Sequence, residues 1–125
     1  MLVDTDVLIW YSRANPKAIN FIHQLDGFSI SVVTYMEIMQ GTRNQHEAVA
    51  FNRLVSQLSI KIIQIDELIS SKAMFFVEKY ALSYNMQLAD ALIGVTAINR
   101  QLKLATANTK HYQYLQEVKI EKFEV

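Results

Sequence analysis

Hydrophobic and polar positions follow two periods in turn along this chain. Short apolar or alternating runs predict strands, and apolar residues at three- and four-residue spacings predict amphipathic helices. The predicted strands are Met1–Val3, Phe28–Val33, Ile60–Ile65, Leu104–Thr106 and Lys119–Val125. The predicted helices run from Pro16 to near Gly27, from Thr34 to near Gly41, and over Glu47–Leu58, Glu67–Tyr84 and Leu88–Leu102. Val7–Tyr11 is apolar without a strict period of two, and its structure stays open.

Capping signals support several of these helix boundaries. Asn15-Pro16 matches an N-cap residue followed by proline in the first helical position. Asp66 is expected to cap the helix that begins at Glu67. Thr34-x-x-Glu37 fits a capping box, in which the glutamate side chain satisfies the backbone at the start of its own helix.

Strands separated by helices predict an α/β fold. We expect a central, mainly parallel sheet of about five short strands with helices on both faces. The length suits one domain covering residues 1–125. Ligands of such sheets bind at the carboxyl ends of the strands, near the point where the strand order reverses. That edge is where functional residues are expected.

Composition excludes several classes of protein. Hydrophobic residues make up 51% and charged residues 19%, and there is no cysteine, which excludes a disulfide framework, a thiolate metal site and a cysteine nucleophile. The 12 basic and 12 acidic residues cancel, so any contact with nucleic acid must come from a local patch. No apolar run approaches the ~18 residues of a membrane span, and no signal peptide is recognisable. We therefore expect a cytoplasmic protein.

Several acidic residues have no cationic neighbour in the local sequence. Asp4 and Asp6 follow the first predicted strand directly. Glu37 and Asp90 have no basic residue three or four positions away, and Asp90 lies in a mostly apolar helix. A buried carboxylate without a partner is unfavourable by several kcal/mol. A shared divalent cation would satisfy these acids, because Mg²⁺ takes oxygen ligands and uses a few carboxylates with water.

Structural explanations remain open for each acid. Glu37 fits the capping box, and Asp90 would favour the positive end of a helix dipole. Asp4 could be a hydrogen-bonded turn residue after its strand. Asp6 fits the N-cap of a short following helix.

Four segments together resemble the motifs of PIN-domain nucleases, and within them the VapC-type toxins of toxin–antitoxin pairs. The order and spacing of the segments match across nearly the whole chain, and the third is the most specific. They are Met1–Trp10, Ser31–Gly41, Leu88–Ala97 and Leu104–Tyr112.

The resemblance implies an endoribonuclease that depends on Mg²⁺ or Mn²⁺. Carried over by position, Asp4, Glu37 and Asp90 would bind the metal, and Asn108 stands at the family's fourth acidic position. An amide brings no charge, which puts a second tightly bound ion in doubt. Three further residues are expected to support these ligands from beside the site: Asp6, Thr5 and Thr106.

The resemblance also implies partners. The family usually forms homodimers and binds an antitoxin, and its substrate is RNA. An acidic pocket repels RNA, so basic residues at its rim are needed to bind the phosphate backbone. The candidates are Arg13, Arg43, Lys110 and His111, each of which could equally be ordinary surface charge.

Two other functions fit parts of the sequence. Asp4-Thr5-Asp6 resembles the nucleophile motif of haloacid dehalogenase-type phosphatases, although Val7-Leu8 replaces the expected Gly-Thr. Alternatively, the chain could be a PIN-like module that binds nucleic acid or a partner without catalysis.

Overall fold

The computed structural model describes residues 1–125, and its centre is a five-stranded sheet. The strand order is β3-β2-β1-β4-β5, and every neighbouring pair is parallel. The strands are β1 (Leu2–Val3), β2 (Ser29–Ser31), β3 (Lys61–Ile63), β4 (Leu104–Thr106) and β5 (Ile120–Lys122). The expected parallel sheet of about five short strands is confirmed.

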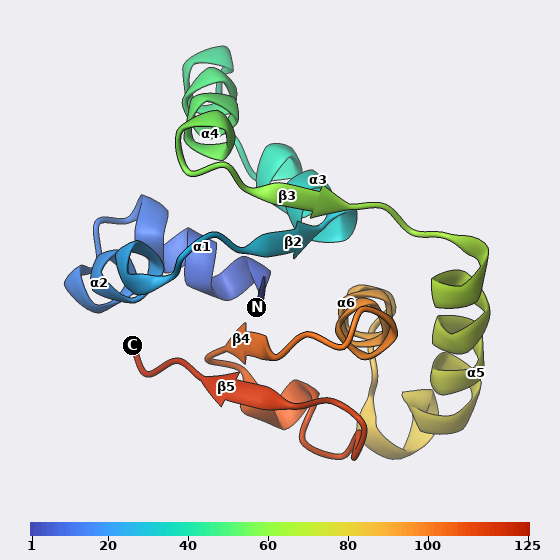
Figure 1. Ribbon diagram of the computed structural model, residues 1–125. Helices are drawn as coiled ribbons and strands as arrows, with labels where there is room; N and C mark the ends of the chain where they lie inside the picture. Colours follow the sequence, from blue (N-terminus) through green and yellow to red (C-terminus); the bar gives the residue numbers. More distant parts are fainter.

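Six helices and one 3₁₀ turn connect these strands (Figure 1). They are α1 (Thr5–Ser12), α2 (Pro16–Gln24), α3 (Val32–Gln40), α4 (Gln45–Gln57), α5 (Glu67–Tyr84), α6 (Leu88–Asn99) and η1 (Thr109–His111). In Figure 1, α1 and α2 lie on one side of the strands, and α5 and α6 lie on the other. None of these helices is long and apolar enough to cross a membrane.

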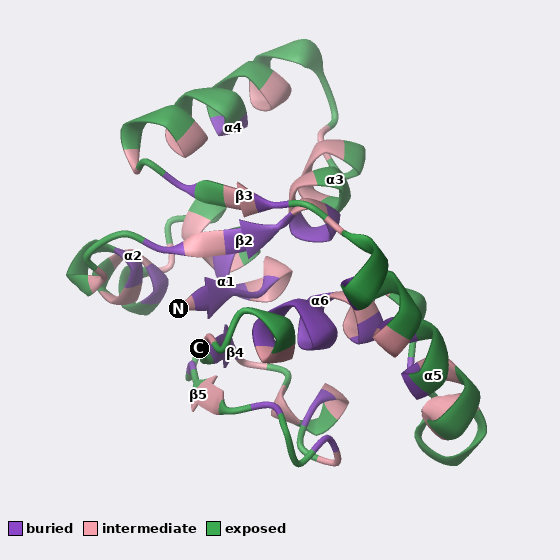
Figure 2. Ribbon diagram, turned by 45° about the vertical axis from the view of Figure 1, so that its right-hand side comes forward, coloured by how far each residue is buried: buried purple, intermediate pink, exposed green.

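The two faces of the sheet each carry a hydrophobic core. One core joins the sheet to α5 and α6 through residues such as Ile69, Phe76 and Ile93. The other joins it to α1, α2 and α4, with Leu8 and Ile22 among its members. Figure 2 shows the consequence: the inner strands β1, β2 and β4 and helix α6 are largely buried, whereas the edge strands β3 and β5 are only partly buried and the outer surfaces of α4 and α5 are exposed. Helices on both faces are thereby confirmed.

The structure corrects the expected start of α3. This helix begins at Val32, and its N-cap is Ser31, whose hydroxyl accepts a hydrogen bond from the backbone N–H of Val33. The capping box at Thr34 and Glu37 is therefore wrong, because both residues already lie inside the helix. The strand ends where the serine caps, so no loop separates β2 from α3. The caps at Asn15 and Asp66 are confirmed, and Val7–Tyr11 lies within α1.

Replacing Ser31 by alanine is expected to lower the free energy of unfolding by about 1 kcal/mol, because the N–H of Val33 loses its acceptor in a buried setting. Urea unfolding of Ser31→Ala measures this. Ser29→Ala is the matched control, since Ser29 lies in the same strand and caps no helix. Equal losses in the two variants would contradict a specific capping role for Ser31.

Three helix N-termini meet the same edge of the sheet. Helices α1 and α3 follow β1 and β2 directly and therefore start at the carboxyl ends of these strands. Helix α6 precedes β4 with only a short connection, so it runs back along the sheet and also starts at this edge. Helix N-termini carry partial positive charge and free N–H groups, which favour anions.

Candidate active site

The candidate site lies where the strand order reverses. The chain proceeds from β1 outward to β2 and β3, and then returns to place β4 on the other side of β1. Asp4 follows β1 and Thr106 ends β4, so the two side chains meet at this switch point.

Asp4 is a buried carboxylate with no cationic partner. Its side chain is 5% exposed and caps α1 by accepting a hydrogen bond from the N–H of Thr5 at 2.8 Å. The hydroxyl of Thr106 donates to its other oxygen, also at 2.8 Å. Burial, together with the negative charge of Asp6, raises the pKa of Asp4 from 3.8 to about 6. A nearby positive charge would offset this unfavourable ionisation.

Asp6 links the start of α1 to the segment after β4 by hydrogen bonds to backbone N–H groups. One carboxylate oxygen accepts from the N–H of Val7 at 2.8 Å. The other accepts from the N–H groups of Ala107 at 2.9 Å and Asn108 at 3.2 Å. The expected N-cap role is wrong, because Asp4 caps α1 and Asp6 lies in its first turn. Partial burial raises the pKa of Asp6, so this carboxyl group also loses its proton less readily than an exposed aspartate does.

Glu37 reaches the site from α3 through two threonine hydroxyls. The Oγ1 of Thr5 lies 2.7 Å from Oε1 of Glu37 and 2.9 Å from Oγ1 of Thr34. Each hydroxyl has one proton, so Thr5 can donate to Glu37 while it accepts from Thr34. Thr34 is fully buried, whereas Glu37 is exposed. The chain of hydrogen bonds directs the Glu37 carboxylate toward the helix that Asp4 caps.

Asp90 enters from the first turn of α6, as expected for an acid at the positive end of a helix dipole. Its side chain is 16% exposed, and its Oδ1 lies 3.5 Å from Nδ1 of His111 in η1. Tyr112, which follows His111, is buried, and its hydroxyl lies near Asp4. Burial and the Asp4 charge raise the pKa of Tyr112, which therefore stays a neutral hydrogen-bond donor.

The remaining candidates lie around these acids or away from them. Asn108 is exposed next to Asp6, and Lys110 is exposed in η1. The guanidinium of Arg13 lies over the ring of Trp10 at 5.6 Å. Arg43 forms an ion pair with Glu47 at 2.8 Å before α4, so it is not a free cation.

The carboxylate and hydroxyl oxygens of this site are the kind of ligand that a hard divalent cation prefers, but they do not surround a single point. No group of three or more acidic or histidine side chains converges on one point. However, Mg²⁺ binds through one or two carboxylates and completes its shell with water and substrate phosphates, so a cage is not needed. Asp4, Asp6 and Glu37 take part in no ion pair within the chain. Oxygen donors with an uncompensated negative charge fit such an ion.

Sequence reasoning missed two residues of this site. The sequence marks Thr34 only as a cap, although its place three residues before Glu37 in the same motif is a usable signal. Tyr112 carries no such signal, because only the packing of distant segments brings its hydroxyl to Asp4.

The sequence and the fold match known proteins. A family model described as PIN domain matches residues 1–115. Ribonuclease VapC10 of Mycobacterium tuberculosis is 32% identical over 123 residues, which cover 95% of this chain and 90% of that protein. Ribonuclease VapC1 of Methanocaldococcus jannaschii is 32% identical over 120 residues, with 94% and 82% covered.

A solved structure has the same fold as this chain. A toxin–antitoxin complex from Klebsiella pneumoniae contains a chain that superposes with a TM-score of 0.82 at 27% identity, covering 99% of this chain and 98% of that one. This chain is thus an α/β protein with acidic residues gathered at the switch point of a parallel sheet. Within that class, this chain belongs to the PIN-domain family.

Proposed function

We propose that this protein is a divalent-cation-dependent endoribonuclease and the toxin of a toxin–antitoxin pair. The family match and the two ribonuclease relatives support RNA phosphodiester hydrolysis. The observation that carries the proposal is the buried Asp4 carboxylate, which lies beside Asp6 at the switch point with no cation from the chain.

Asp4 and Asp90 would hold the ion, and Glu37 would bind it through water or orient the attacking water. When bound, Mg²⁺ or Mn²⁺ makes hydroxide available near neutral pH and stabilises negative charge on the phosphate. The residues themselves do not distinguish these two ions, since both accept oxygen donors.

The other residues of the site have positioning roles in this proposal. Thr106 donates to Asp4 and Thr5 to Glu37, which keeps each carboxylate in one orientation. Asp6 accepts hydrogen bonds from the backbone N–H groups of Ala107 and Asn108, which fixes the position of Asn108 at the rim of the site. The side-chain amide of Asn108 can accept or donate a hydrogen bond but adds no charge.

Replacing Thr5 by valine is expected to slow RNA cleavage roughly tenfold, because residues that orient metal-binding carboxylates typically contribute that much. The substitution keeps the side-chain shape and leaves Glu37 without its donor. Initial cleavage rates at saturating cation measure the effect. Thr5→Ser keeps the hydroxyl and should retain most of the rate; equal losses in both variants would argue against hydrogen bonding as the cause.

Basic groups near the rim would bind the RNA backbone. Lys110 is exposed in η1, and the partly exposed ring of His111 lies beside Asp90. The N-termini of α1, α3 and α6 add N–H dipoles directed at the same edge. Arg13 is placed farther along α1 and is the weaker candidate, and the Arg43 ion pair makes a dedicated RNA role for that residue less favourable.

The partners in this proposal are an antitoxin and a second copy of the chain. The Klebsiella structure with the same fold is a toxin–antitoxin complex. An antitoxin that covers the acidic edge would prevent cleavage until it is removed.

The experiment is cleavage of a mixed RNA pool by the purified protein with Mg²⁺, with Mn²⁺ and with chelator. We expect cutting only with a cation, and a loss in Asp90→Asn exceeding the roughly 10- to 100-fold effects of residues that merely support a metal. Asp66→Asn is the control, because it removes one carboxylate at an exposed helix cap away from the site and keeps a good capping residue.

The outcome also separates the alternatives. If the folded, partner-free protein binds RNA but cuts none with either cation, it is a binding module. A covalent phosphate trapped on Asp4 would instead support the phosphatase chemistry.

A further inference from the structure

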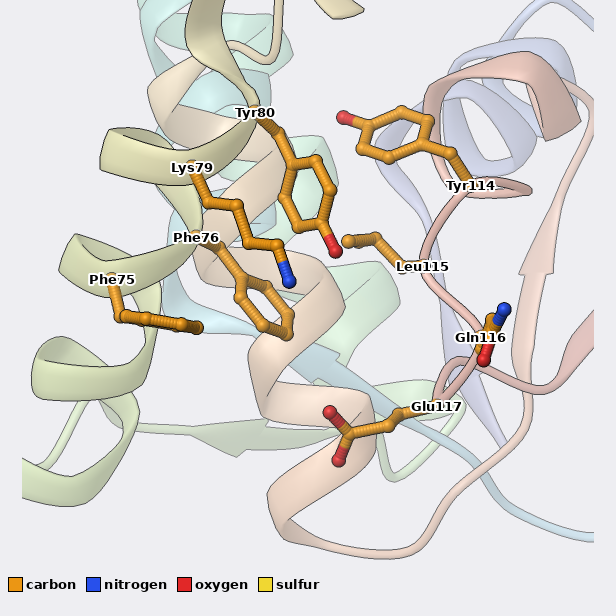
Figure 3. A pocket seen from close by; sticks show the side chains of 8 residues that line it. All are labelled: Phe75, Phe76, Lys79, Tyr80, Tyr114, Leu115, Gln116 and Glu117. Atoms are coloured by element: carbon orange, nitrogen blue, oxygen red, sulfur yellow. The ribbon is translucent and has the colours of Figure 1, made fainter. Parts of the chain in front are cut away.

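A pocket of about 310 Å³ lies between α5 and the segment that follows η1. Figure 3 shows that Phe75, Phe76, Lys79 and Tyr80 line it from α5, and that Tyr114–Glu117 form the opposite wall. Half of the lining residues are aromatic, and the volume is at the lower end for ligand pockets.

A stacked pair of tyrosine rings adjoins this pocket, since one of the two, Tyr114, also lines it. The rings of Tyr84 and Tyr114 are 4.2 Å apart and within 6° of parallel. Tyr80 contacts both, at centroid distances of 5.8 Å and 5.2 Å. Tyr84 remains 56% exposed despite these contacts, so part of the aromatic surface of this cluster is open to solvent. The three residues are called the tyrosine cluster below.

A cation without an acidic partner accompanies the tyrosine cluster. The Nζ of Lys79 lies 5.3 Å from the ring centre of Tyr80 and 5.9 Å from that of Phe75. Lys79 takes part in no ion pair, whereas Lys72 on the same helix pairs with Glu117 at 2.8 Å. Glu117 is thus neutralised by Lys72, and Lys79 is free to meet an anionic group at the pocket.

The tyrosine cluster is continuous with the candidate active site. Tyr84 ends α5, and a short turn leads to α6, whose first turn contains Asp90. Tyr114 follows shortly after His111, whose ring contacts Asp90. Burial, and then the negative charge of Asp90, raise the pKa of Tyr114. A chain bound with a phosphate at Asp90 would therefore pass the tyrosine cluster.

We propose that Tyr84, Tyr114 and Lys79 form a subsite that stacks one base of single-stranded RNA beside the phosphate that is cut. This inference rests on the proposed ribonuclease function. Aromatic faces bind unpaired bases of any sequence, and a neighbouring lysine binds the backbone phosphate. A base in a duplex cannot reach such a face, so the subsite selects single-stranded RNA.

The first test separates binding from chemistry in steady-state kinetics. Tyr84→Ala is expected to raise KM for a short single-stranded RNA about tenfold, since loss of one base stack typically weakens binding roughly 5- to 150-fold. The value of kcat should change little, because the cation-binding acids are untouched. Tyr84→Phe keeps the ring and should behave as wild type. Leu82→Ala is the control for loss of exposed apolar surface on the same helix.

A second measurement does not depend on cleavage. Tyr84→Trp places a fluorescent ring in the tyrosine cluster, and the single-stranded RNA should quench it while the duplex of the same sequence should not. Trp10 provides the background, which the wild-type protein measures. If the wild type cuts no RNA, the proposed function fails, whereas this quenching still decides whether bases stack here.

Two results would overturn the subsite. One is an unchanged KM for Tyr84→Ala together with no quenching in Tyr84→Trp. The other is a shift of Tyr84→Ala to a smaller oligomer in sedimentation, with kcat and KM altered together; the tyrosine cluster would then be an interface between copies of this chain.

Discussion

Asp4→Asn is expected to abolish RNA cleavage and, in the absence of divalent cation, to make the protein more stable near neutral pH. The two effects have the same origin. Without a divalent cation the buried carboxylate is unfavourable, and in the proposed mechanism its charge is what holds the cation. Asparagine keeps an acceptor for the N–H of Thr5, so α1 retains a good cap.

The sign of the stability effect follows from the pKa. Burial, and then Asp6, raise the pKa of Asp4 in the folded protein from 3.8 to about 6. The folded state therefore binds this proton more tightly, and the stabilisation present below about pH 4 is lost as the pH rises through about 6. At about 1.4 kcal/mol per pH unit, the full loss is on the order of 3 kcal/mol. The neutral amide of the Asp4→Asn variant avoids this loss.

Urea unfolding with chelator, across the range from about pH 4 to 8, measures this prediction. The free energy of unfolding of Asp4→Asn should exceed that of wild type by about 1–3 kcal/mol near pH 8, with the difference shrinking toward pH 4. Asp66→Asn removes an exposed carboxylate as the matched control. A destabilised Asp4→Asn at high pH would show that the carboxylate has a favourable partner within the chain.

Divalent cations are expected to stabilise the wild-type protein strongly at about pH 8 and weakly at about pH 5. Below the Asp4 pKa of about 6, protons compete with the cation for the same carboxylate. Each pH unit below this pKa should then weaken the apparent affinity for the cation by up to about tenfold. With free cation at 100 times its Kd, the stabilisation is about 2.7 kcal/mol, which corresponds to a Tm increase of roughly 10 °C for a domain of this size.

Thermal unfolding with Mg²⁺ or Mn²⁺ at several pH values checks this dependence. The Tm increase should be largest at the highest pH and should nearly vanish in Asp4→Asn at every pH. An equal Tm increase at both ends of the range, or an unchanged one in Asp4→Asn, would place the cation at another site.

Local patterns were sufficient for most of the framework. The bounds of α5 and β4 were predicted correctly, and the caps at Asn15 and Asp66 follow from neighbouring residues alone. These features depend on interactions within one turn or one strand. The alternation of strands and helices then implies a parallel sheet, and a parallel sheet implies that residues after its strands share one edge.

Local sequence patterns do not predict contacts between segments that are far apart in the chain. The start of α3 was misplaced because serine at the strand end competes with threonine further on, and only the sheet register decides which one caps. Asp6 was expected to cap α1, but β4 brings two backbone N–H groups to its carboxylate.

Periodicity and chain order are enough to predict most of the helices and strands, the parallel sheet and the edge at which the acids gather. How the side chains meet at that edge depends on the tertiary structure. It buries Asp4 deeply enough to raise its pKa, joins Glu37 to Thr5, and stacks Tyr84 on Tyr114. Such contacts depend on the packing of residues far apart in the chain, for which no local pattern exists.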